Sequence, residues 1–398
     1  MEKKINLLVI THNYPRFEGD YAGIFIHLLC KNLLQFDIQP IVLVPHDKGV
    51  KEYEERDGVK IYRFRYAEDE NNQNLAYRGQ MHKLVLGSIS GIFKFQSFLN
   101  YFRKSAFEII EKEKINAVAG HWLIPSGLVM KTIKSKYNFP MVMSSHGTDI
   151  RLLYKYSGMA YKYLKSFCLN LKSWTVVSNF MKEELLKTDK NLYKNLQVLP
   201  LPHDESIFYY DESVKKDENL ITSVTRFTEQ KRVDILIKAF ALVVEKNDLA
   251  KLHIYGEGDL QTEIEKLIEK FGLQSKVTIF APVPQEQLRA VYNQAAIVVL
   301  NSYQEGFGLA LSEAMMCKTS VVGTRSGGII DIIKDNETGL LCELDNVSDL
   351  ANKLSLLLSD KSLRDKLASN GHKFAHENYA SYALSQKYAE LIKKVVEN

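Results

Sequence analysis

The sequence predicts an α/β protein with two parallel-sheet domains, and three observations support this expectation. Short runs rich in Val and Ile alternate with helical patterns, which is typical of parallel βαβ units rather than of hairpins. The alternation stops and then begins again, so that two series follow each other along the chain. A length of 398 residues, 45% of them hydrophobic, is enough to form more than one core.

The first series contains seven expected strands and two clear helical patterns. The strands are Ile5–Ile10, Gln39–Pro45, Lys60–Phe64, Ala117–Gly120, Met141–Ser145, Ser173–Val177 and Gln197–Leu199, and the helices are Phe25–Phe36 and Tyr101–Glu113. The second series contains the expected strands Leu220–Thr225, Lys251–Tyr255, Val277–Phe280, Ile297–Leu300 and Ser320–Gly323. Its first helix has one apolar face, formed by Val233, Leu236, Ile237, Phe240 and Val244.

A proline-containing stretch, Pro200–Asp204, and the polar stretch Asp211–Asn219 are expected to connect the two series. We therefore expect an N-terminal domain over residues 1–203 and a C-terminal domain over residues 204–378. Residues 379–398 show a further amphipathic pattern and are expected to form a terminal helix.

Charge is divided unevenly along the chain, whose net charge is +4. Residues 1–200 carry 29 Lys or Arg and 19 Asp or Glu, so their net charge is +10, which leaves −6 for residues 201–398. A basic half is typical of proteins with an anionic partner, such as a phosphorylated lipid, a membrane surface or a nucleic acid. Because the cations are dispersed, an ordinary solvated surface stays an alternative.

Targeting signals and cysteine patterns point to the cytoplasm. The first apolar run, Ile5–Ile10, is too short for a signal peptide, and no run approaches the roughly 18 apolar residues of a membrane-spanning helix. We expect a cytoplasmic protein, with peripheral contact at the inner face of the cell membrane left open. The four cysteines are scattered without a C-x-x-C pair, which favours reduced thiols over a disulfide frame or zinc site.

The densest group of candidate residues, 301–315, follows an expected strand and opens a helix. Ligands of open α/β sheets bind beyond the carboxyl ends of strands, where the first amides of the next helix attract anions. Glu305 and Glu313 could accept hydrogen bonds from sugar or ribose hydroxyls, while Gly306 and Gly308 allow close backbone approach. The alternative is a tight turn followed by a solvated glutamate.

Two cations follow the first strand of the second series. Arg226 and Lys231 stand where an arginine fork and a lysine ammonium can hold a diphosphate. Surface charges are the alternative, but a sheet edge shared with Glu305 favours an anion site. Gly256 follows the next strand and is expected to let the chain turn close to a ligand. Gln261 replaces the third glycine of a G-x-G-x-x-G pattern, which argues against a nicotinamide dehydrogenase.

In the first half, polar or glycine-bearing loops follow three expected strands. His146 could hydrogen-bond a substrate or move a proton, because its ordinary pKa lies near neutrality, although a core histidine is the alternative. Gly23 belongs to a loop before the first helix that permits close approach of phosphate or sugar. His121 and Trp122 would face the same ligand.

Several common catalytic patterns are absent from the sequence. It contains no D-x-D triplet, P-loop, H-E-x-x-H, G-x-S-x-G or zinc spacing, so we expect neither a divalent metal nor another cofactor. It also lacks a nucleic-acid recognition motif, so no nucleic-acid partner is expected.

These motifs together resemble the retaining GT-B glycosyltransferases of glycosyltransferase family 4. The matching residues are Arg226 with Lys231, Gly256-Glu257-Gly258, the Glu-x7-Glu pair Glu305 and Glu313, Thr324–Gly328, Thr338–Leu341, and more weakly Ala22-Gly23, His121-Trp122 and His146–Asp149. The resemblance implies two Rossmann-like domains that face a central cleft, with the donor bound mainly by the second domain and the acceptor by the first. It also implies that the terminal helix crosses back onto the first domain.

The resemblance also implies residue roles. Arg226 and Lys231 would neutralise the diphosphate leaving group, Glu305 would bind donor sugar hydroxyls, Glu313 would hold the ribose, and His146 would lie near the reacting sugar. Donor contacts are further implied for Gly23, Gly256, Gly306, Phe307, Gly308 and Leu309. The chain departs from the family at Thr225, where a glycine is usual, and at Pro202-His203-Asp204, where a proline-asparagine-glycine turn is usual.

The resulting expectation is a metal-independent, hexosyltransferase-type enzyme of surface polysaccharide biosynthesis. Its donor would be a UDP- or GDP-linked sugar, and its acceptor a glycan or a glycan linked to a lipid diphosphate. The alternatives are another GT-B-like enzyme, such as an epimerase or phosphorylase, and a non-catalytic nucleotide-sugar-binding protein. Segment 83–103 is apolar and aromatic with flanking cations, and is expected either to pack in the core or to dock a lipid-linked acceptor at the membrane.

Overall fold

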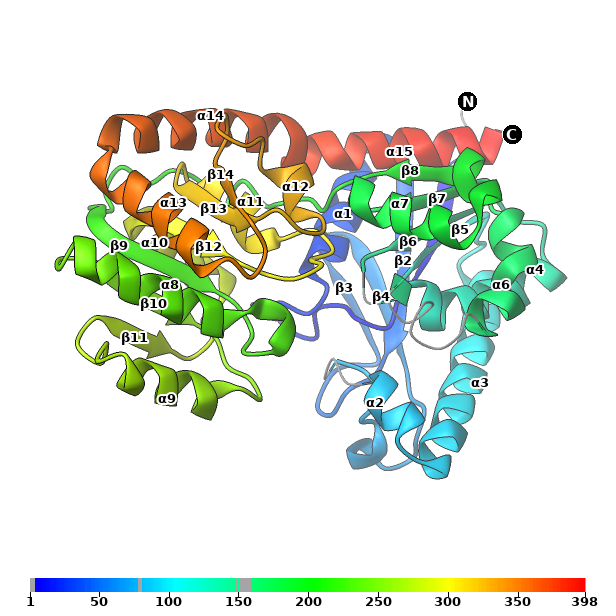
Figure 1. Ribbon diagram of the computed structural model, residues 1–398. Helices are drawn as coiled ribbons and strands as arrows, with labels where there is room; N and C mark the ends of the chain where they lie inside the picture. The colour runs from blue at the N-terminus through cyan, green and yellow to red at the C-terminus, as the bar shows by residue number, and fades with distance from the viewer. Residues whose placement is uncertain (1–3, 78–80, 148, 151–158, 398) are drawn as a thin grey trace. The chain divides into compact units, whose positions relative to one another are not determined.

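The structure is a computed structural model that describes residues 4–77, 81–147, 149–150 and 159–397. The chain forms two compact units, each with its own sheet and covering helices (Figure 1). Unit 1 consists of Met1–Val177, Met181–Pro202 and Ser381–Asn398, and unit 2 consists of Ser178–Phe180 and His203–Ala380. The two series of expected strands therefore fall in different units.

Unit 1 contains an eight-stranded sheet in the order β3-β4-β2-β1-β5-β6-β7-β8. The strands are β1 Ile5–Ile10, β2 Ile38–Pro45, β3 Tyr53–Arg56, β4 Val59–Phe64, β5 Ala117–His121, β6 Met141–Ser145, β7 Ser173–Val176 and β8 Leu196–Val198. All seven strands expected from the sequence are confirmed to within one residue at each end. These seven strands pair in parallel with one another. Helices connect consecutive strands of the seven, as parallel pairing requires, except that β3 lies between β2 and β4.

Strand β3 was not expected. The sequence pattern favoured parallel units over hairpins, and this is wrong for β3 and β4 at the edge of the sheet. It pairs antiparallel with β4 through a two-residue turn at Asp57 and Gly58, whose φ angles are 49° and 74°. An Asp-Gly turn with two positive φ angles is a favoured hairpin connection. The strand itself reads Tyr-Glu-Glu-Arg, so it lacks the Val and Ile content by which the other strands were recognised.

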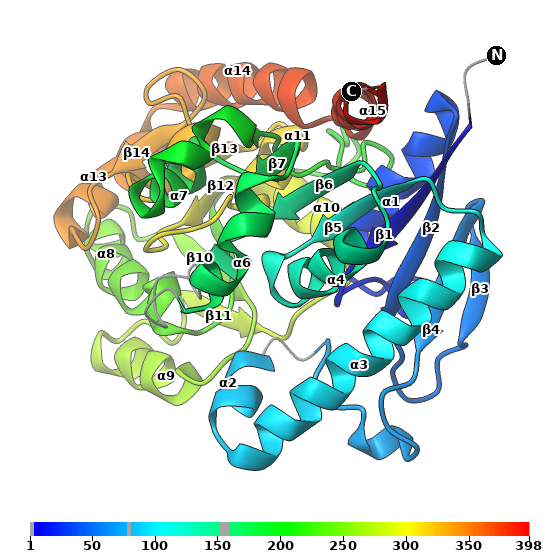
Figure 2. The same cartoon turned by 90° about the vertical axis from the view of Figure 1, so that its right-hand side faces the viewer.

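The helices of unit 1 cover both faces of its sheet (Figure 2). They are α1 Ile24–Leu33, α2 Met81–Leu86, α3 Ile89–Lys112, α4 Leu128–Lys136, α6 Met159–Leu169, α7 Asn179–Thr188, which begins in unit 2, and α15 Ser381–Glu397, with short helical turns at Leu34–Phe36, Glu70–Asn72, Leu123–Gly127 and Lys190–Asn195. Helix α15 packs against α1 and the sheet, with Tyr388 and Ile392 buried beside Ile26 and Leu29. It begins at Ser381, two residues later than the sequence pattern indicated.

Unit 2 contains a fully parallel six-stranded sheet in the order β11-β10-β9-β12-β13-β14. The strands are β9 Asp217–Val224, β10 Lys251–Tyr255, β11 Val277–Phe280, β12 Ala295–Leu300, β13 Ser320–Thr324 and β14 Leu340–Cys342. The five expected strands are confirmed. The linker expected over Asp211–Asn219 is wrong at its end, because Asp217 already pairs with Ala295. Strand β14 reads Leu-Leu-Cys and was missed because it contains no Val or Ile.

The helices of unit 2 bury the faces that the sequence predicts. They are α8 Val233–Lys246, α9 Gln261–Lys270, α10 Gln285–Gln294, α11 Leu309–Met316, α12 Ile329–Ile332, α13 Val347–Ser359 and α14 Lys361–Tyr379, with a short turn at Glu229–Lys231. In α8 the residues Leu236, Ile237 and Phe240 are fully buried, and Val244 is partly buried against the same cluster. This packing holds the start of α8, and hence the loop after β9, against the sheet.

Both sheets place their candidate residues at a topological switch point. In unit 1, β1 lies between β2, the next strand along the chain, and β5, a strand much later in the chain. In unit 2, β9 lies in the same way between β10, the next strand, and β12, a later one. At such a point the loops that follow two neighbouring strands run in opposite directions across the sheet. Their separation leaves room for a ligand beyond the carboxyl ends of the strands. The candidate residues after β1, β5, β9 and β12 lie on these loops.

Two further expectations concern cysteines and membrane spans. All four cysteines are free and buried, as the scattered pattern predicts. Within the described part of the chain, no helix combines the length and apolar character required to cross a bilayer.

Replacing Ile392 by Ala tests how strongly α15 is docked on unit 1. Ile392 is 1% exposed within the apolar cluster of unit 1, so truncation leaves a cavity and should lower the free energy of unfolding by about 2–4 kcal/mol. The exposed Gln386 lies on the same helix, and Gln386→Ala should change it by less than about 0.5 kcal/mol. Urea denaturation of the full chain measures both, and equal effects would contradict the docking.

Candidate functional site

The loops after β9 and β12 of unit 2 are joined by direct hydrogen bonds. The Tyr303 amide donates to the Gln230 carbonyl oxygen at 2.7 Å, and the Gln230 side-chain amide donates to the Gln304 carbonyl oxygen at 3.3 Å. These bonds bring Lys231 and Glu305, 74 residues apart in sequence, into contact as an ion pair. The structure thus brings together two of the residues that the sequence singles out.

The Lys231–Glu305 pair is shielded, whereas the neighbouring arginine is exposed. The side chains of Lys231 and Glu305 are 12% and 17% exposed. Arg226 follows β9 on the same loop, and its guanidinium makes no hydrogen bond or ion pair to any described residue. An exposed guanidinium with its donors free can bind a phosphate by two hydrogen bonds.

Hydrogen bonds join the loop that carries Glu305 to the loop after β13. The Gly328 amide donates to the Glu305 carbonyl oxygen at 2.7 Å, and the Ser326 hydroxyl accepts from the Gln304 amide at 3.1 Å. Gly327 has φ +61°, and a Cβ at this position would lie 2.5 Å from the Glu305 backbone nitrogen. Only glycine satisfies both constraints, which explains the Gly327-Gly328 pair in the sequence.

Gly306, Phe307, Gly308 and Leu309 form the entry to helix α11. Gly308 occupies the N-cap with φ 111°, and Leu309 is the first helical residue. The first amides of a helix lack partners within it and carry a partial positive charge, so this turn can face an anion. The Phe307 side chain is buried edge-on against Tyr379, with ring centroids 5.4 Å apart, so only its backbone can face a ligand.

Glu313 lies on the second turn of α11 and is almost fully buried. The Tyr292 hydroxyl of α10 donates to its Oε2 atom at 2.8 Å. Burial raises the pKa of Glu313 to about 7, although the Tyr292 hydrogen bond opposes the shift. The solvated glutamate considered from the sequence is therefore wrong.

Gly256 fits the expected tight turn at the end of β10. Its amide donates to the Phe280 carbonyl oxygen at 3.0 Å, and the Phe227 amide donates to the neighbouring Glu257 carbonyl oxygen at 2.9 Å. The second bond fixes the loop that carries Arg226 against the loop after β10. A Cβ on Gly256 would lie 1.8 Å from the Thr225 carbonyl oxygen, so the absence of a side chain lets the Arg226 loop pack closely on this turn.

In unit 1, His146 belongs to a cluster of aromatic rings at the strand ends. Its Nε2 atom lies 3.0 Å from Nδ1 of His121, and the two rings are stacked. Trp122 and Phe25 contact the same ring, with centroids 4.7 and 5.0 Å away, and His12 packs on Trp122. The loops after β1, β5 and β6 therefore meet, as the sequence predicts for His121, Trp122 and His146.

Burial keeps this histidine cluster neutral. It lowers the pKa of His12 to about 4, that of His121 to about 3, and that of His146 well below its ordinary value. The Nδ1 atom of His146 is buried without a hydrogen-bond partner among the described residues. A neutral imidazole with one unused nitrogen is suited to hydrogen bonding with a hydroxyl.

Asp149 and Gly23 fix the loops around this cluster. The Asp149 carboxylate accepts from the amides of Leu123 at 2.8 Å and of His146 and Gly147 at 3.2 Å, so it ties the loop after β5 to the loop after β6. Gly23 has φ +62° at the N-cap of α1, and a Cβ there would lie 2.4 Å from the Asn13 carbonyl oxygen. Gly23 therefore allows the β1 loop to fold back on itself. Thr148, next to Asp149, lies outside the described residues.

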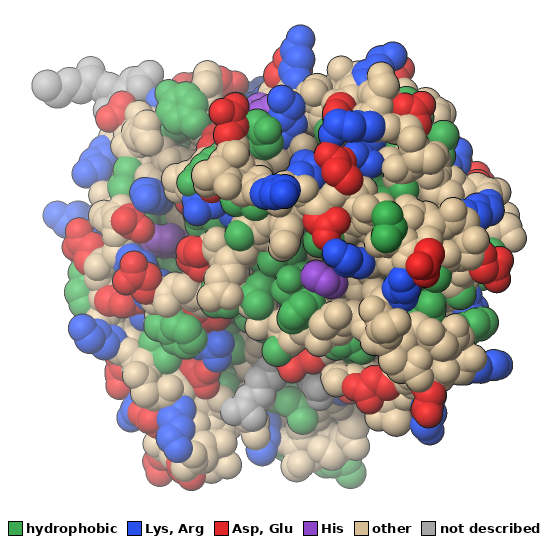
Figure 3. Space-filling model, turned by 90° about the vertical axis from the view of Figure 1, so that its left-hand side faces the viewer, with side chains coloured by type: hydrophobic (Ala, Val, Ile, Leu, Met, Phe, Trp, Pro, Cys, Tyr) green, Lys and Arg blue, Asp and Glu red, His purple; other side chains and the backbone are tan. Residues whose placement is uncertain are grey.

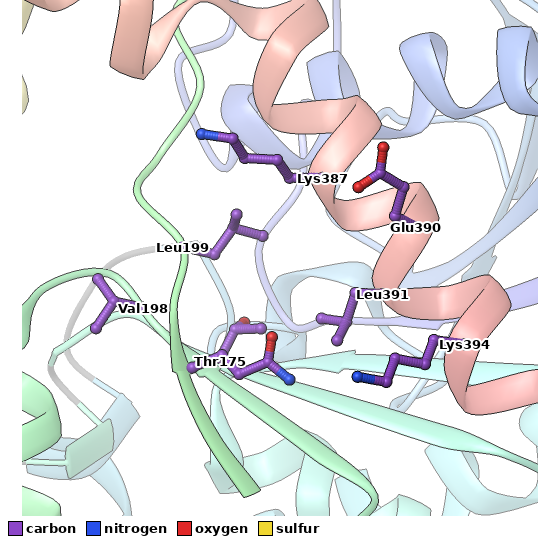
Figure 4. Close-up of a pocket in the computed structure, with 8 residues that line it drawn as sticks. Thr175, Val198, Leu199, Lys387, Glu390, Leu391 and Lys394 are labelled. Atoms are coloured by element: carbon purple, nitrogen blue, oxygen red, sulfur yellow. The ribbon is translucent and has the colours of Figure 1, made fainter. Parts of the chain in front are cut away.

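A separate pocket of about 330 Å³ lies in unit 1 between the β7–β8 edge and α15 (Figure 4). Thr175, Val198 and Leu199 line one side, and Leu391 with Lys394 lines the other. Figure 4 shows the Lys394 side chain extending from α15 toward the strands. None of the candidate residues from the sequence lines this pocket.

The described residues include no group of three or more His, Cys, Asp or Glu side chains placed to hold a metal ion. The clustered histidines His12, His121 and His146 do not form such a group. The available chemistry is that of cations, amides, a buried carboxyl group and neutral imidazoles.

Two parallel-sheet α/β domains with these residues at their strand ends define a GT-B glycosyltransferase. The family model described as Glycosyl transferases group 1 matches residues 209–374, and the model described as Glycosyltransferase Family 4 matches residues 22–205. The chain belongs to this glycosyltransferase family.

Relatives and solved structures agree with this assignment. The chain is 30% identical to an uncharacterized glycosyltransferase of Methanocaldococcus jannaschii, over 73% of this chain and 80% of that protein. Sucrose-phosphate synthase from Thermosynechococcus elongatus shares the fold with a TM-score of 0.79 and 20% identity, over 98% of this chain and 99% of that one. Anabaena HepE in complex with UDP and glucose has a TM-score of 0.72 and 16% identity, over 98% and 100%.

Three contributors to the site were not found from the sequence. Tyr292 supplies the partner of Glu313 from the last turn of α10, 21 residues away, where an isolated tyrosine gives no signal. His12 and Phe25 complete the ring cluster of unit 1. His12 could have been found, because it directly follows the first strand and so occupies the same strand-end position as the other candidates.

Replacing Glu313 by Gln tests the raised pKa of this carboxyl group. Between its unfolded pKa of 4.5 and its folded value of about 7, the folded state binds more protons, so stability falls as pH rises through this range. Glutamine keeps the shape but does not titrate. The unfolding free energy of the wild type minus that of Glu313→Gln should fall by roughly 1 kcal/mol per pH unit between pH 5 and 7. Urea denaturation at several pH values measures it, and a pH-independent difference would contradict the shift.

Proposed function

We propose that the protein transfers a hexose from a nucleoside-diphosphate sugar to a hydroxyl group of a glycan or lipid-linked glycan, with retention at the anomeric carbon. One observation carries the proposal: Arg226 and the Lys231–Glu305 pair lie on the loops beyond the carboxyl ends of β9 and β12. The first amides of α11 and the buried Glu313 belong to the same unit. These groups supply cations for a diphosphate and carboxyl groups for hydroxyls.

In the proposed reaction the bond between the sugar C1 atom and the phosphate oxygen breaks, and its electron pair stays on the diphosphate. The acceptor oxygen forms the new bond to C1, and its proton passes to the leaving phosphate oxygen. Negative charge therefore grows on the diphosphate, where Arg226, Lys231 and the amides at the start of α11 would stabilise it.

The ion pair between Lys231 and Glu305 suggests how donor and product are distinguished. A bound donor would offer phosphate oxygens to Lys231 and sugar hydroxyls to Glu305, so that each side chain exchanges its present partner for a substrate group. A nucleoside diphosphate without the sugar would offer phosphate oxygens to Lys231 but no hydroxyl groups to Glu305. Glu305 therefore favours the complete donor.

Support for the donor and acceptor classes comes from several sources. HepE, which shares the fold, binds UDP and glucose, and this agrees with a UDP-linked donor, with GDP as the alternative base. In unit 1 the unused nitrogen of His146 would accept from or donate to a sugar hydroxyl. Family resemblance supports retention and a place in surface polysaccharide biosynthesis.

The donor site is tested by thermal-shift measurements with UDP-, GDP-, ADP- and CDP-sugars. A ligand that binds only the folded state raises its melting temperature, so one nucleotide class should raise it for the wild type. Arg226→Ala should weaken binding of that donor at least about tenfold, because it removes a charged phosphate contact. It should also lower kcat/KM for transfer by roughly 100-fold.

The matched control is Lys251→Ala. Lys251 is also a cation of the unit 2 sheet, but it begins β10 and so lies at the opposite end of the strands, paired with Asp217. It should leave donor affinity unchanged. Equal losses in both variants, or no shift with any nucleotide sugar, would contradict the proposed site.

Treatment with EDTA tests the proposed independence of metal. If Arg226, Lys231 and helix amides provide the charge that stabilises the diphosphate, chelation should change turnover by less than about twofold. The assay is sugar transfer by the purified protein before and after dialysis against EDTA. A loss restored by Mg²⁺ or Mn²⁺ would overturn this part of the proposal.

A further inference from the structure

Four large apolar side chains are exposed at one end of the α2–α3 helix pair. They are Leu84 at 40%, Ile89 at 76%, Ile92 at 55% and Phe93 at 70% exposed. Ile89 and Phe93 are four residues apart on α3, so they lie on the same face of the helix. We call these four residues the apolar tip. Contiguous exposed apolar groups of this size mark binding surfaces in other proteins.

The rest of α3 shows that this exposure is local. From Phe98 onward the helix buries Phe98, Leu99, Phe102 and Ile109 in unit 1, and Phe64 of β4 stacks on Phe102 with centroids 4.4 Å apart. The first turns of α3 bury only Gly91. The helix is therefore anchored by its second half and presents its first turns outward (Figure 2).

Specific contacts between α2 and α3 fix the arrangement of the apolar tip. The Ser88 hydroxyl caps α3 by accepting from the Gly91 amide at 3.0 Å. A Cβ on Gly91 would lie 2.0 Å from the Leu84 carbonyl oxygen, so α2 packs closely on the start of α3. These contacts hold Leu84 beside the exposed residues of α3.

The stretch of sequence that contains the apolar tip carries charge of one sign. Residues 71–107 contain five Lys or Arg and no Asp or Glu, and Lys83 and Lys94 are immediate neighbours of the exposed apolar residues. By contrast, both signs are interspersed over the face of the molecule shown in Figure 3. Apolar side chains flanked by cations match the interface of an anionic bilayer, where acyl chains lie beneath negative headgroups.

We propose that the apolar tip inserts into the surface of an anionic lipid membrane, with Lys83 and Lys94 at the level of the headgroups. A second protein would also cover apolar residues, but a 37-residue stretch without a carboxylate favours a uniformly negative partner. The inference does not depend on the proposed donor site, which lies in the other unit. It goes beyond the sugar transfer by assigning a surface at which the protein is held.

Sedimentation with vesicles tests the proposal on the full chain. The protein should bind vesicles of phosphatidylcholine with 40% phosphatidylglycerol, and bind vesicles of pure phosphatidylcholine at least fivefold more weakly. The double variant Ile92→Ser/Phe93→Ser should weaken binding to anionic vesicles at least fivefold. Lys94→Glu should weaken it as well, and high salt should reduce the difference between wild type and Lys94→Glu.

Phe271→Ser is the matched control, because Phe271 is 41% exposed but belongs to unit 2. It should leave vesicle binding unchanged. Equal melting temperatures of the wild type and the double variant would show that the exposed substitutions leave the fold intact. No vesicle binding by the wild type, or equal binding by wild type and double variant, would overturn the proposal. So would a change of oligomeric state in the double variant with unchanged vesicle binding, because the tip would then be a protein interface.

Discussion

The structure depends on the parallel arrangement of strands around β1 and β9. Each of these strands is buried between neighbours that are reached in opposite directions, so the following loops diverge at the carboxyl edge. The sheets are covered by helices, and their central strands tolerate little movement. Residues as distant in sequence as Lys231 and Glu305 can therefore meet with fixed geometry. The glycines of the site serve this arrangement, since Gly327 supports one loop and Gly23 another.

Burial divides the charged groups of unit 2 into two kinds. Arg226 is exposed and makes no bond to any described residue, and Lys231 is paired with Glu305 and partly shielded. Glu313 is buried and accepts a hydrogen bond from the Tyr292 hydroxyl, and burial raises the pKa of its carboxyl group to about 7. Unit 2 thus combines two cations, Arg226 and Lys231, with the carboxyl group of Glu313, whose charge state depends on its burial. The neutral histidines of unit 1 add hydrogen-bonding capacity without adding charge.

Much of the fold follows from the sequence, because buried parallel strands are nearly continuous apolar runs. Strand β3 was not predicted because three of its four residues are charged, and β14 because it contains no Val or Ile. The candidate residues could be found because strand ends are recognisable and because short motifs follow them. Tyr292 and the linking role of Asp149 could not, since both depend on which elements pack together. The roles implied for Arg226, Glu305 and His146 stay predictions.

Helix α3 shows where sequence patterns stop being informative. Its apolar and aromatic residues continue from Ile89 to Ile110 without a break in character, so composition favours one buried face throughout. The large apolar residues of α3 that are buried begin at Phe98, whereas Ile89, Ile92 and Phe93 are exposed. The same hydrophobic character therefore stabilises unit 1 at one end of α3 and is unsatisfied at the other. Because exposed apolar surface is costly in water, the exposed first turns of α3 favour the proposed partner outside unit 1, and the nearby Lys83 and Lys94 favour an anionic one.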